Sequence, residues 1–321
     1  MKSFDRITIN KAMKAAIYKS YGPPSVLELT DIEKPTPKSN EILVKVHAAT
    51  VTAGDVRVRA SDFPPLFWLP ARLIFGLFKP KKSTLGHEFA GVVEAAGSKV
   101  TKFTAGDAVF GTTTMLPTGS YAEYVCVPES WKSGVVAPKP ENLSFQESAA
   151  LPIGAMTALF LLRKAKIDPS KKVLVYGASG SVGTYAVQLA RHLGMSVTGV
   201  CSAGNIAMIK SLGADEVIDY KQQDYSALPS KFDIVFDAVG KTTRSAAKKV
   251  LKTGGVFVSV NMLTSEQEEN LLELKGMAEN GLIKPYIDKV FPLEEVEAAH
   301  EYVDRGRKRG NVVIEVAGLG D

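Results

Sequence analysis

The sequence is poor in residues that cross-link chains or hold metals: its 321 residues include two cysteines, Cys126 and Cys201, and four histidines. Two cysteines cannot form a disulfide framework, and alone they cannot supply a four-thiolate zinc site. We therefore expect a protein of the reducing cytoplasm. Charge of one sign is not in large excess, because 39 basic residues face 34 acidic ones, and the one dense basic cluster covers residues 305–310. Such a short cluster is typical of a solvated helix end, so nucleic-acid binding is not expected.

Long hydrophobic runs are also absent. The most apolar segment, residues 63–80, contains Arg72 and falls short of the roughly 20 apolar residues that a membrane-spanning helix needs. It is interrupted by four residues that disturb helices: Pro64, Pro65, Pro70 and Gly76. We interpret it as a loop or short helices, which either cover a core or form the wall of an apolar substrate pocket or a partner surface. Residues 1–18 lack an apolar stretch and a small-residue cleavage site, so no secretory signal is expected.

The sequence changes in character near Ser144. Its length suggests roughly two domains at about 150 residues each, and its 45% hydrophobic content is that of an ordinary globular protein. Short β-rich runs separated by Gly, Pro and Asp fill the first third, which predicts a β barrel or sandwich. After Ser144, helical stretches such as 146–166 alternate with short Val-rich strands, which predicts a parallel sheet covered on both faces. The tail reads as strand, helix and strand, and we expect it to complete the first domain.

A glycine-rich run lies between a predicted strand, residues 172–177, and a predicted helix. The run is Gly177-Ala178-Ser179-Gly180-Ser181-Val182-Gly183. Glycines there allow a tight turn and a close approach of the backbone, and the helix N-terminus attracts a pyrophosphate. A glycine-rich loop alone is weak evidence, but the flanking strand and helix and the following βα repeats supply the context that a dinucleotide site requires. The alternative is a structural turn that packs the helix against the strand and binds no nucleotide.

The end of the second predicted strand, residues 198–205, bears on the choice of nucleotide. An acidic residue at this place would hold the ribose hydroxyls of NAD, and none is present. Ser202 and Asn205 could instead donate hydrogen bonds to a 2′-phosphate. We therefore expect NADPH rather than NADH, although no Arg or Lys lies in the loop itself and Lys210 is further along the helix.

Several motifs together resemble one family. The stretch GHEFAGVVEAAG, residues 86–97, resembles the G-H-E-x-x-G signature of the medium-chain dehydrogenase/reductase superfamily. The order of DAVFG, GSYAEYVCVP, AALPIGAMTAL, GASGSVG and GGVFVSVN is similar to that of its quinone oxidoreductase branch. The resemblance covers Met13 to Val316 and implies an α/β plus β fold. A GroES-like β-barrel domain, residues 1–137 and 285–321, is expected to be interrupted by a Rossmann nucleotide-binding domain, residues 138–284.

The resemblance also allows a test for catalytic zinc. In the zinc alcohol dehydrogenases a Cys, the His of the G-H-E motif and a second Cys bind the metal, and the matching positions here are Thr52, His87 and Ile153. One remaining ligand cannot hold a zinc ion that needs three protein ligands and an open position. We therefore expect a zinc-independent enzyme, with His87 as a hydrogen-bonded histidine under the turn of the motif and Glu88 nearby.

The same resemblance assigns further residues of the site. In zinc-free members, hydride passes to the β-carbon of an activated alkene or to a quinone. Thr52 lies where these reductases often carry the Asn of an N-x-x-D pattern, and Asp55 matches its Asp. The Thr52 hydroxyl is expected to contact the substrate or the ribose, and Asp55 to orient the loop. The residues expected to bind the cofactor are Thr157, Gly177, Ser179, Gly180, Ser181, Val182, Gly183, Ser202, Asn205, Tyr220, Val260, Asn261 and Asn311.

Three departures from the family pattern stand out. Arg57 replaces the tyrosine that some quinone reductases carry, so the proton donor is unassigned. Asn205 replaces the lysine that can bind the 2′-phosphate. Members usually carry a sixth Rossmann strand whose edge pairs in a homodimer, but here we count five, so the sixth is missing or residues 262–265 supply a stub, and the usual dimer contact is in doubt.

The leading hypothesis is therefore an NADPH-dependent, zinc-independent reductase of quinones or α,β-unsaturated carbonyl compounds with small apolar substrates. Two alternatives stay open. An alcohol or aldehyde oxidoreductase would need zinc or another electrophile. A non-enzymatic NADPH-binding protein would have a structural or regulatory role.

Overall fold

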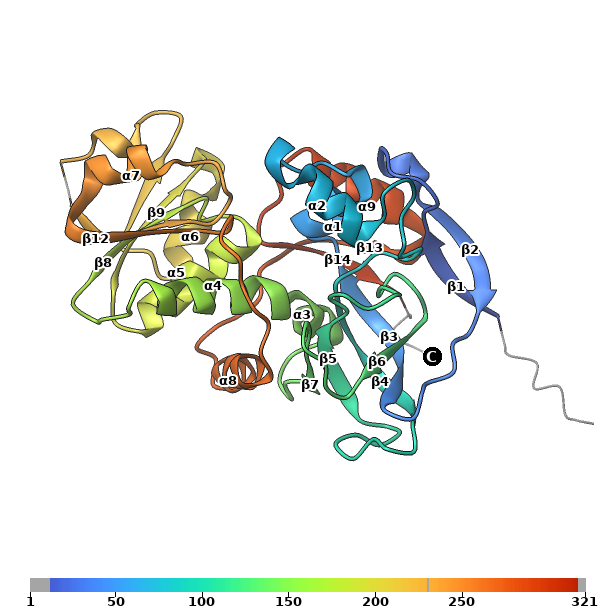
Figure 1. Ribbon diagram of the computed structural model, residues 1–321. Coiled ribbons are helices and arrows are strands. Elements are labelled where there is room, and N and C mark those ends of the chain that lie inside the picture. Colours follow the sequence, from blue (N-terminus) through green and yellow to red (C-terminus); the bar gives the residue numbers. More distant parts are fainter. Residues whose placement is uncertain (1–11, 230, 317–321) are drawn as a thin grey trace, which may run out of the picture.

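The chain folds around two large β-sheets that lie side by side. The structure, a computed structural model, describes residues 12–229 and 231–316. A seven-stranded mixed sheet and a five-stranded parallel sheet each form the centre of one half of the molecule, and a small sheet pairs β1 (Ala12–Ile17) with β2 (Glu28–Glu33). The N-terminal and C-terminal parts of the chain share the half on the right of Figure 1, and the middle of the chain forms the left half.

The mixed sheet has the order β13-β14-β3-β4-β5-β7, with β6 pairing β3 beside this path. Its strands are β3 (Glu41–Thr50), β4 (Glu88–Ala96), β5 (Ala108–Thr112), β6 (Tyr124–Pro128), β7 (Val136–Pro138), β13 (Ile287–Pro292) and β14 (Asn311–Glu315). Alternate residues of β3, namely Ile42, Val44 and Val46, are fully buried in one apolar cluster, as the period-two pattern of a half-covered strand requires. The last strand therefore lies against the first third of the chain.

The helices of this half lie on one side of the mixed sheet. They are α1 (Ala53–Ala60), α2 (Pro65–Phe75) and α9 (Val296–Asp304), with the short 3₁₀ helices η1 (Pro24–Val26) and η4 (Leu293–Glu295). Helix α9 buries Val296, Ala299 and Val303 in a cluster that also contains Leu85 and Tyr121. Arg59 of α1 is 2% exposed and ties the two helices together, because its Nη2 donates to Asp304 Oδ2 at 2.8 Å.

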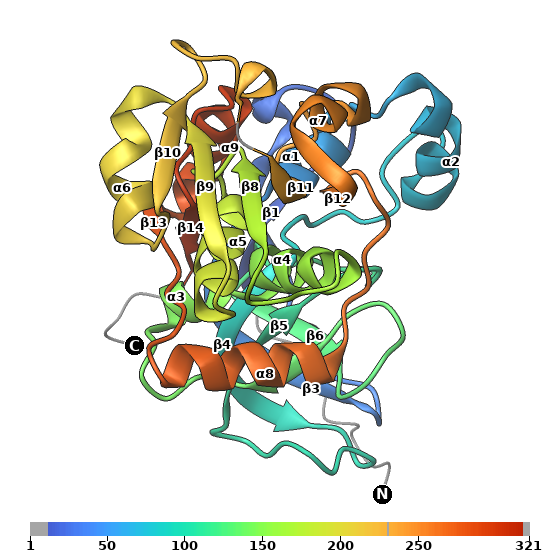
Figure 2. The same ribbon diagram turned by 90° about the vertical axis from the view of Figure 1, so that its left-hand side faces the viewer.

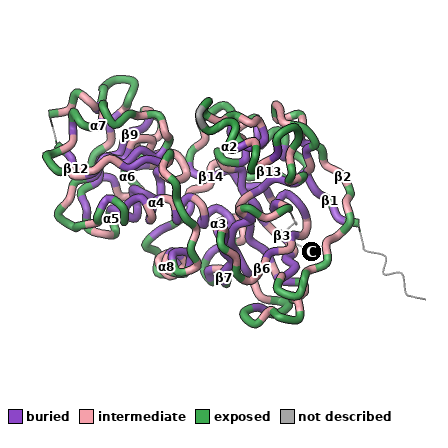
Figure 3. Tube along the Cα trace, viewed as in Figure 1, coloured by how far each residue is buried: buried purple, intermediate pink, exposed green. Residues whose placement is uncertain are grey.

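The parallel sheet has the order β10-β9-β8-β11-β12. Its strands are β8 (Lys172–Tyr176), β9 (Ser196–Cys201), β10 (Glu216–Asp219), β11 (Phe232–Asp237) and β12 (Leu251–Ser259). Val173 and Val175 of β8 belong to one buried cluster and Leu174 to another, so both faces of the sheet are covered. Figure 3 shows the strands buried and the outer surfaces of the helices exposed.

Helices cover both faces of the parallel sheet or join the two halves. They are α3 (Phe145–Ala150), α4 (Pro152–Lys164), α5 (Ser181–His192), α6 (Ile206–Ser211), α7 (Arg244–Val250) and α8 (Glu268–Glu279), with η2 (Ala203–Asn205) and η3 (Tyr225–Ala227). Residues of α4, α5 and α6 join the cluster that holds Val173, whereas Ala247 and Val250 of α7 join the one that holds Leu174.

The element pattern agrees with the sequence in outline and differs in the break of one helix and in three elements that were not predicted. The described parallel sheet has five strands, as predicted, and residues 262–265 form no strand, so β12 is an edge. The single helix predicted over 146–166 is two helices, α3 and α4, because Pro152 lacks the N–H that would continue the first one. Helix α1, strand β2 and strand β7 were not predicted, and each is short or follows no clean alternation.

The expected return of the tail to the first domain is seen in the register of β14. This strand pairs antiparallel with β3, Val313 lying opposite Thr50. The domain boundaries at 137/138 and 284/285 stay a prediction, and residues 1–11 and 317–321 of the expected ranges lie outside the described residues. Within the described part of the chain, no helix is long and apolar enough to cross a membrane.

Candidate active site between the two sheets

The glycine-rich run forms the turn from β8 into α5. Gly177 has φ of +77°, and a Cβ there would lie 2.5 Å from Val239 Cγ1. At Gly183 a Cβ would lie 2.2 Å from the Gly177 carbonyl oxygen, so helix and turn approach too closely for a side chain. Gly180 differs, because a Cβ there would meet nothing nearer than 3.6 Å. The first N–H groups of α5 have no acceptor within the helix and are available to an anion.

The other residues predicted to bind the cofactor follow the carboxyl ends of the neighbouring strands. Ser202 follows β9, Tyr220 follows β10, and Val260 with Asn261 follows β12. These ends lie at one edge of a parallel sheet, where α/β proteins bind nucleotides, and the strand order reverses between β8 and β11. Ser202, Tyr220 and Asn261 bring polar side chains to this edge of the sheet, and their contact with a cofactor stays a prediction.

The place proposed for the 2′-phosphate has a feature that the sequence analysis missed. Asn205 Nδ2 donates to Ser202 Oγ at 3.2 Å, so both predicted partners lie together. Asp219, the last residue of β10, lies opposite Cys201 in the register of the two strands. A carboxylate therefore lies next to the end of β9 although none follows that strand in sequence.

Asn311 joins the glycine-rich turn to the mixed sheet. It is 3% exposed, its Oδ1 accepts from Ser181 Oγ at 2.6 Å, and its Nδ2 donates to the Tyr286 carbonyl at 3.1 Å. The Gly310 N–H donates to the Ser179 carbonyl at 2.8 Å. The side chains of Ser181 and Asn311 thus bond to each other across the two halves, and a direct contact of either with a cofactor stays a prediction. The same holds for Thr157, which is half-buried on α4.

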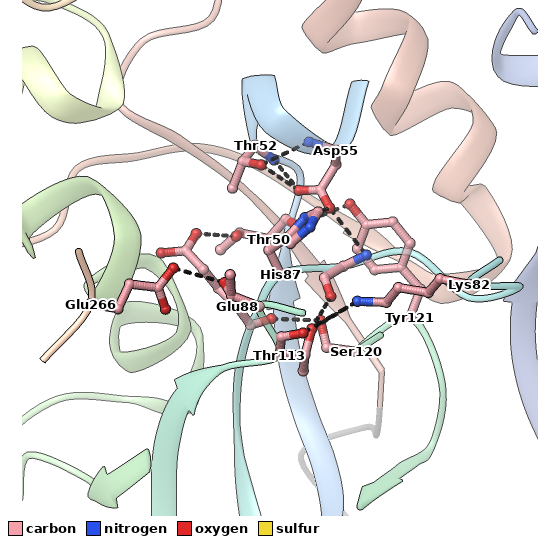
Figure 4. A network of polar contacts seen from close by, with 12 residues as sticks. Thr50, Thr52, Asp55, Lys82, His87, Glu88, Thr113, Ser120, Tyr121 and Glu266 are labelled. Atoms are coloured by element: carbon pink, nitrogen blue, oxygen red, sulfur yellow. Dashed lines mark hydrogen bonds and ion pairs between the residues drawn. The ribbon is translucent and has the colours of Figure 1, made fainter. Parts of the chain in front are cut away.

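Thr52 and Asp55 begin helix α1 as a capping box. The Asp55 N–H donates to Thr52 Oγ1 at 3.0 Å, and the Thr52 N–H donates to Asp55 Oδ2 at 2.8 Å. The Thr52 hydroxyl donates to the same Oδ2 at 2.5 Å. Asp55 Oδ1 accepts from the Gly86 N–H at 3.1 Å and lies 2.6 Å from His87 Nδ1, so the aspartate joins α1 to the G-H-E turn (Figure 4).

These four donors decide what Asp55 can do. Burial by itself would raise its pKa, but the imidazole of His87 and the hydrogen bonds from His87 and Thr52 outweigh it and hold the pKa at about 2. A carboxylate with both oxygens occupied and so low a pKa is a poor proton acceptor. The geometry fits an orienting side chain, and the Thr52 hydroxyl, which already donates its proton, can only accept a hydrogen bond from a bound molecule.

Glu88, the next residue after His87, connects the two halves. It is 2% exposed, its Oε2 accepts from the Thr50 hydroxyl, and its Oε1 accepts from the Ile153 N–H at 2.6 Å. Burial raises the pKa of this carboxyl to about 7, against the lowering effect of its two hydrogen bonds. Ile153 lies in the first turn of α4, so Glu88 caps an N–H group that has no partner in its own helix.

Lys82 is a polar residue of the site that the sequence analysis did not single out. Its Nζ donates to Thr113 Oγ1 at 3.1 Å, and Thr113 in turn donates to the Gly86 carbonyl at 2.6 Å (Figure 4). Burial lowers the pKa of Lys82 to about 8, opposed by the charge of Asp55. In sequence it stands at the end of Lys79-Pro80-Lys81-Lys82, a run that reads as a solvated loop, and only the fold turns it inward.

Glu266 also enters the site without a sequence signal. It precedes α8, and its carboxylate accepts from the hydroxyls of Thr112 at 2.5 Å and Thr114 at 2.7 Å, on the other half of the molecule. Burial raises its pKa, and the hydrogen bonds from the two threonine hydroxyls oppose this, with a smaller contribution from His87. A cavity of about 510 Å³ lies behind it, between α8 and the segment around Trp131. None of the predicted site residues lines that cavity.

The side chains near the G-H-E turn do not form a zinc site. The three positions expected to match zinc ligands carry a hydroxyl, an imidazole and an alkyl group, and the imidazole Nδ1 contacts Asp55. Among the described residues, no group of three or more His, Cys, Asp or Glu side chains could hold a metal ion. The residues present do not fit catalytic zinc.

Comparison with known proteins places the chain in a family. The family model described as "Alcohol dehydrogenase GroES-like domain" matches residues 38–141, and two described as "Zinc-binding dehydrogenase" match 181–283 and 259–314. The chain is 35% identical over 328 residues to a 2-methylene-furan-3-one reductase of Solanum lycopersicum, covering 96% of this chain and 80% of that reductase. The chain belongs to the medium-chain dehydrogenase/reductase superfamily, in its quinone oxidoreductase-like branch.

Further comparisons agree with this assignment. The chain is 32% identical to the NADPH-dependent alkenal/one oxidoreductase of Arabidopsis thaliana, over 96% of this chain and 80% of that enzyme. The solved structure of the quinone oxidoreductase from Coxiella burnetii superposes with a TM-score of 0.82 at 29% identity, over 96% of this chain and all of that one. The predicted fold class, a GroES-like domain with a Rossmann-type domain, is confirmed. As a member of this branch, the protein is an NAD(P)H-dependent oxidoreductase.

Proposed function

We propose that this enzyme is an NADPH-dependent, zinc-independent reductase of α,β-unsaturated carbonyl compounds or quinones. The observation that carries the proposal is the arrangement of Thr52, Asp55 and His87, in which the hydroxyl and the imidazole at two of the positions that match zinc ligands are both hydrogen-bonded to Asp55. The printed activities of its relatives, a 2-methylene-furan-3-one reductase and an alkenal/one oxidoreductase, support the substrate class.

The glycine-rich turn and the strand ends suit the binding of the cofactor. The first N–H groups of α5 face a turn kept free of side chains, as a pyrophosphate requires. We expect Ser202 and Asn205, which lie together, to donate to a 2′-phosphate, while the nearby carboxylate of Asp219 would oppose its binding. When bound, NADPH would supply a hydride to the β-carbon of the acceptor, and the reduction would also need a group that stabilises charge on the acceptor oxygen and a source of one proton.

A residue of the mixed-sheet half must stabilise the charge that develops on the acceptor oxygen. Lys82 is our candidate, because its ammonium group donates to Thr113, which in turn donates to the carbonyl of Gly86 on the turn that Asp55 holds in place. A cation close to a developing oxyanion lowers the barrier to reduction, and a protonated lysine can also supply the proton that the product needs. Asp55 holds the start of α1 against the G-H-E turn, so that Thr52 and Lys82 keep fixed positions around the acceptor.

The direct test is turnover. Purified enzyme mixed with NADPH should oxidise it when given a small enone such as 3-buten-2-one or a quinone such as 1,4-naphthoquinone, and oxidation with NADH should be slower. No oxidation with any member of a panel of enones and quinones would contradict the proposal. Binding of NADPH without turnover would favour a regulatory protein, and oxidation of primary alcohols would favour the alcohol dehydrogenase alternative.

A single substitution separates binding from folding. Gly180→Val introduces a side chain where the nearest atoms are 3.6 Å and 3.8 Å from the new Cβ, so the fold has room for it but the phosphate site does not. We expect NADPH affinity to fall at least 100-fold while the thermal midpoint changes little. Gly276→Val, at an equally open position of α8, is the matched control. Unchanged affinity in Gly180→Val would contradict the placement of the pyrophosphate.

A further inference from the structure

Helix α2 exposes a face made almost wholly of apolar side chains. The exposed members of this surface, called here the α2 patch, are Phe67 (61%), Trp68 (43%), Leu69 (53%), Leu73 (58%), Ile74 (50%), Leu77 (38%) and Phe78 (89%). An ordinary surface helix turns polar residues toward water and apolar residues inward. Here the outward side is apolar, and the helix stands away from the body of the molecule at the right-hand edge of Figure 2.

The inward side of α2 explains why the patch cannot turn away from solvent. Ala71 is 8% exposed, and Phe75 stacks on Phe63 with ring centroids 5.8 Å apart. Arg72, the one charged residue of the helix, is half-buried beside the patch: its guanidinium lies 4.0 Å from the centre of the Tyr21 ring and 5.4 Å from that of the Trp68 ring, and Nη1 donates to Ser61 Oγ at 3.2 Å. The orientation of α2 is therefore held by specific contacts, and the apolar face outside is a stable feature.

Positive charge follows directly after the patch. Lys79 and Lys81 are exposed, and the Lys81 ammonium donates to the Leu73 carbonyl at 2.7 Å, close to the apolar face. Between residues 62 and 82 the sequence has four basic residues and a single acidic one, Asp62. An apolar face bordered by lysines matches a surface that is apolar inside and anionic at its edge.

We propose that the α2 patch docks the enzyme on an anionic lipid bilayer, with its aromatic and aliphatic side chains entering the interface and Lys79 and Lys81 facing lipid phosphates. Tryptophan, phenylalanine and lysine are the residues that anchor helices lying in a membrane interface. Each lysine near an anionic surface adds electrostatic attraction to the apolar contribution. A second copy is a poorer occupant, because a two-fold contact through this face would bring its lysines close to their own symmetry mates.

The location of the patch gives the docking a purpose, which rests on the proposed function. Helix α1, which Asp55 holds at its start, precedes α2, and Lys82 follows it. Eleven residues separate Asp55 from Phe67 at the start of the patch, and three separate Phe78 at its end from Lys82, so the patch and the polar site are neighbours along the chain. An enzyme docked in this way would take apolar enones or quinones directly from the bilayer.

Vesicle binding tests the proposal without any assay of turnover. The full-length protein is floated with vesicles of phosphatidylcholine alone or with 30% phosphatidylglycerol. We expect binding to the anionic vesicles that weakens at high salt, and a shift of Trp68 emission to shorter wavelength in a Trp131→Phe background. The variant Phe67→Ser/Leu73→Ser/Phe78→Ser should lose at least tenfold in vesicle affinity. Leu272→Ser/Val290→Ser, at exposed apolar sites elsewhere, is the control and should bind as the parent does.

Several results would overturn the proposal. They are absence of binding to anionic vesicles, unchanged binding of the triple variant, and a parent dimer in solution that the triple variant converts to monomer. A rise in KM for a small water-soluble enone in the triple variant, without vesicles, would show instead that the patch lines the substrate pocket. Vesicle binding by an enzyme that reduces no acceptor would uphold docking and contradict the proposed function alone.

Discussion

Two buried carboxylates, Asp55 in the first turn of α1 and Glu88 at the start of β4, differ in their state of ionisation. Asp55 is 0% exposed and Glu88 is 2% exposed, so burial alone cannot separate them. The pKa of Asp55 is held at about 2, and that of Glu88 is raised to about 7. Asp55 accepts from four donors, two of them on the G-H-E turn, whereas Glu88 accepts from two.

The difference between the two groups shows that a neighbouring imidazole and hydrogen-bond donors, rather than the depth of burial, decide which buried carboxylate stays ionised. Desolvation raises the pKa of both groups, and only a sufficient set of hydrogen bonds with a neighbouring imidazole reverses it. The ionised Asp55 can hold the G-H-E turn firmly. Glu88 titrates near neutrality at the contact between the two halves, so the strength of that contact depends on pH.

The largest effect is expected for Asp55→Asn, which removes the charge and one acceptor oxygen. Four donors then face a group that can satisfy only part of them, and the free energy of unfolding at pH 7 should fall by about 3–5 kcal/mol. Because the pKa of Asp55 is lowered, its contribution is present above pH 3.8 and is lost as the pH falls toward 2. Urea unfolding at pH 7 and pH 3 checks this, and an equal loss at both would contradict it.

The second effect concerns Lys82, on the Asp55 side. Lys82→Met should lower kcat/KM for an enone by about 100-fold, as loss of an oxyanion donor does elsewhere. In the parent enzyme kcat/KM should fall as the pH rises through about 8, where the lysine loses its proton, and the variant should lack this limb. Lys81→Met, at the exposed neighbour, should keep it. A limb that persists in Lys82→Met would show that another group supplies the charge.

A third test removes the ionisable group of Glu88 by substituting glutamine. Glutamine can accept from the Ile153 N–H and donate to the Thr50 hydroxyl, so Glu88→Gln keeps the geometry of the neutral acid. Because the pKa of Glu88 is raised, the parent is stabilised below pH 4.5 and loses this stability as the pH rises through about 7. The stability of Glu88→Gln relative to the parent should therefore rise by about 3 kcal/mol between pH 4 and pH 8. A difference independent of pH would show that Glu88 does not titrate there.

The smallest effect is expected for Thr50→Val, which removes one of the two donors to Glu88. The ionised carboxylate loses more than the neutral acid, which can dispense with a donor. We expect a loss of about 1 kcal/mol in the free energy of unfolding at pH 8 and less at pH 4. Denaturation at both pH values checks it, and a larger loss at pH 4 would contradict the assignment of the donor.

Much of the fold could be predicted because its signals are local. The strand at β8, the glycine-rich turn and helix α5 follow one another in sequence, and the Val-rich strands and the strand-helix-strand tail carry their own patterns. The capping box from Thr52 to Asp55 is also local, but no hydrophobic pattern favoured a helix there, since α1 has few apolar residues and two arginines.

The rest depends on contacts between distant segments. Lys82 reads as part of an exposed basic run, and it becomes a site residue only because Thr113 is brought beside it by strand pairing. Glu266 contacts residues more than 150 positions earlier in the chain, and Asp219 approaches the end of β9 through the register of two strands. No pattern within a short window carries such information. The apolar segment around α2 was recognised, but its outward orientation follows from the contacts of Phe75 with Phe63 and of Arg72 with Tyr21.

Measuring bound zinc together with turnover tests directly whether the enzyme works without a metal. Enzyme purified without chelator is divided, one part is treated with EDTA and dialysed, and both are measured for bound zinc and for NADPH oxidation with an enone. We predict equal kcat/KM in both parts with far less than one zinc per chain. Stoichiometric zinc whose removal abolishes turnover and whose return restores it would contradict a metal-free site built on Thr52, Asp55 and His87.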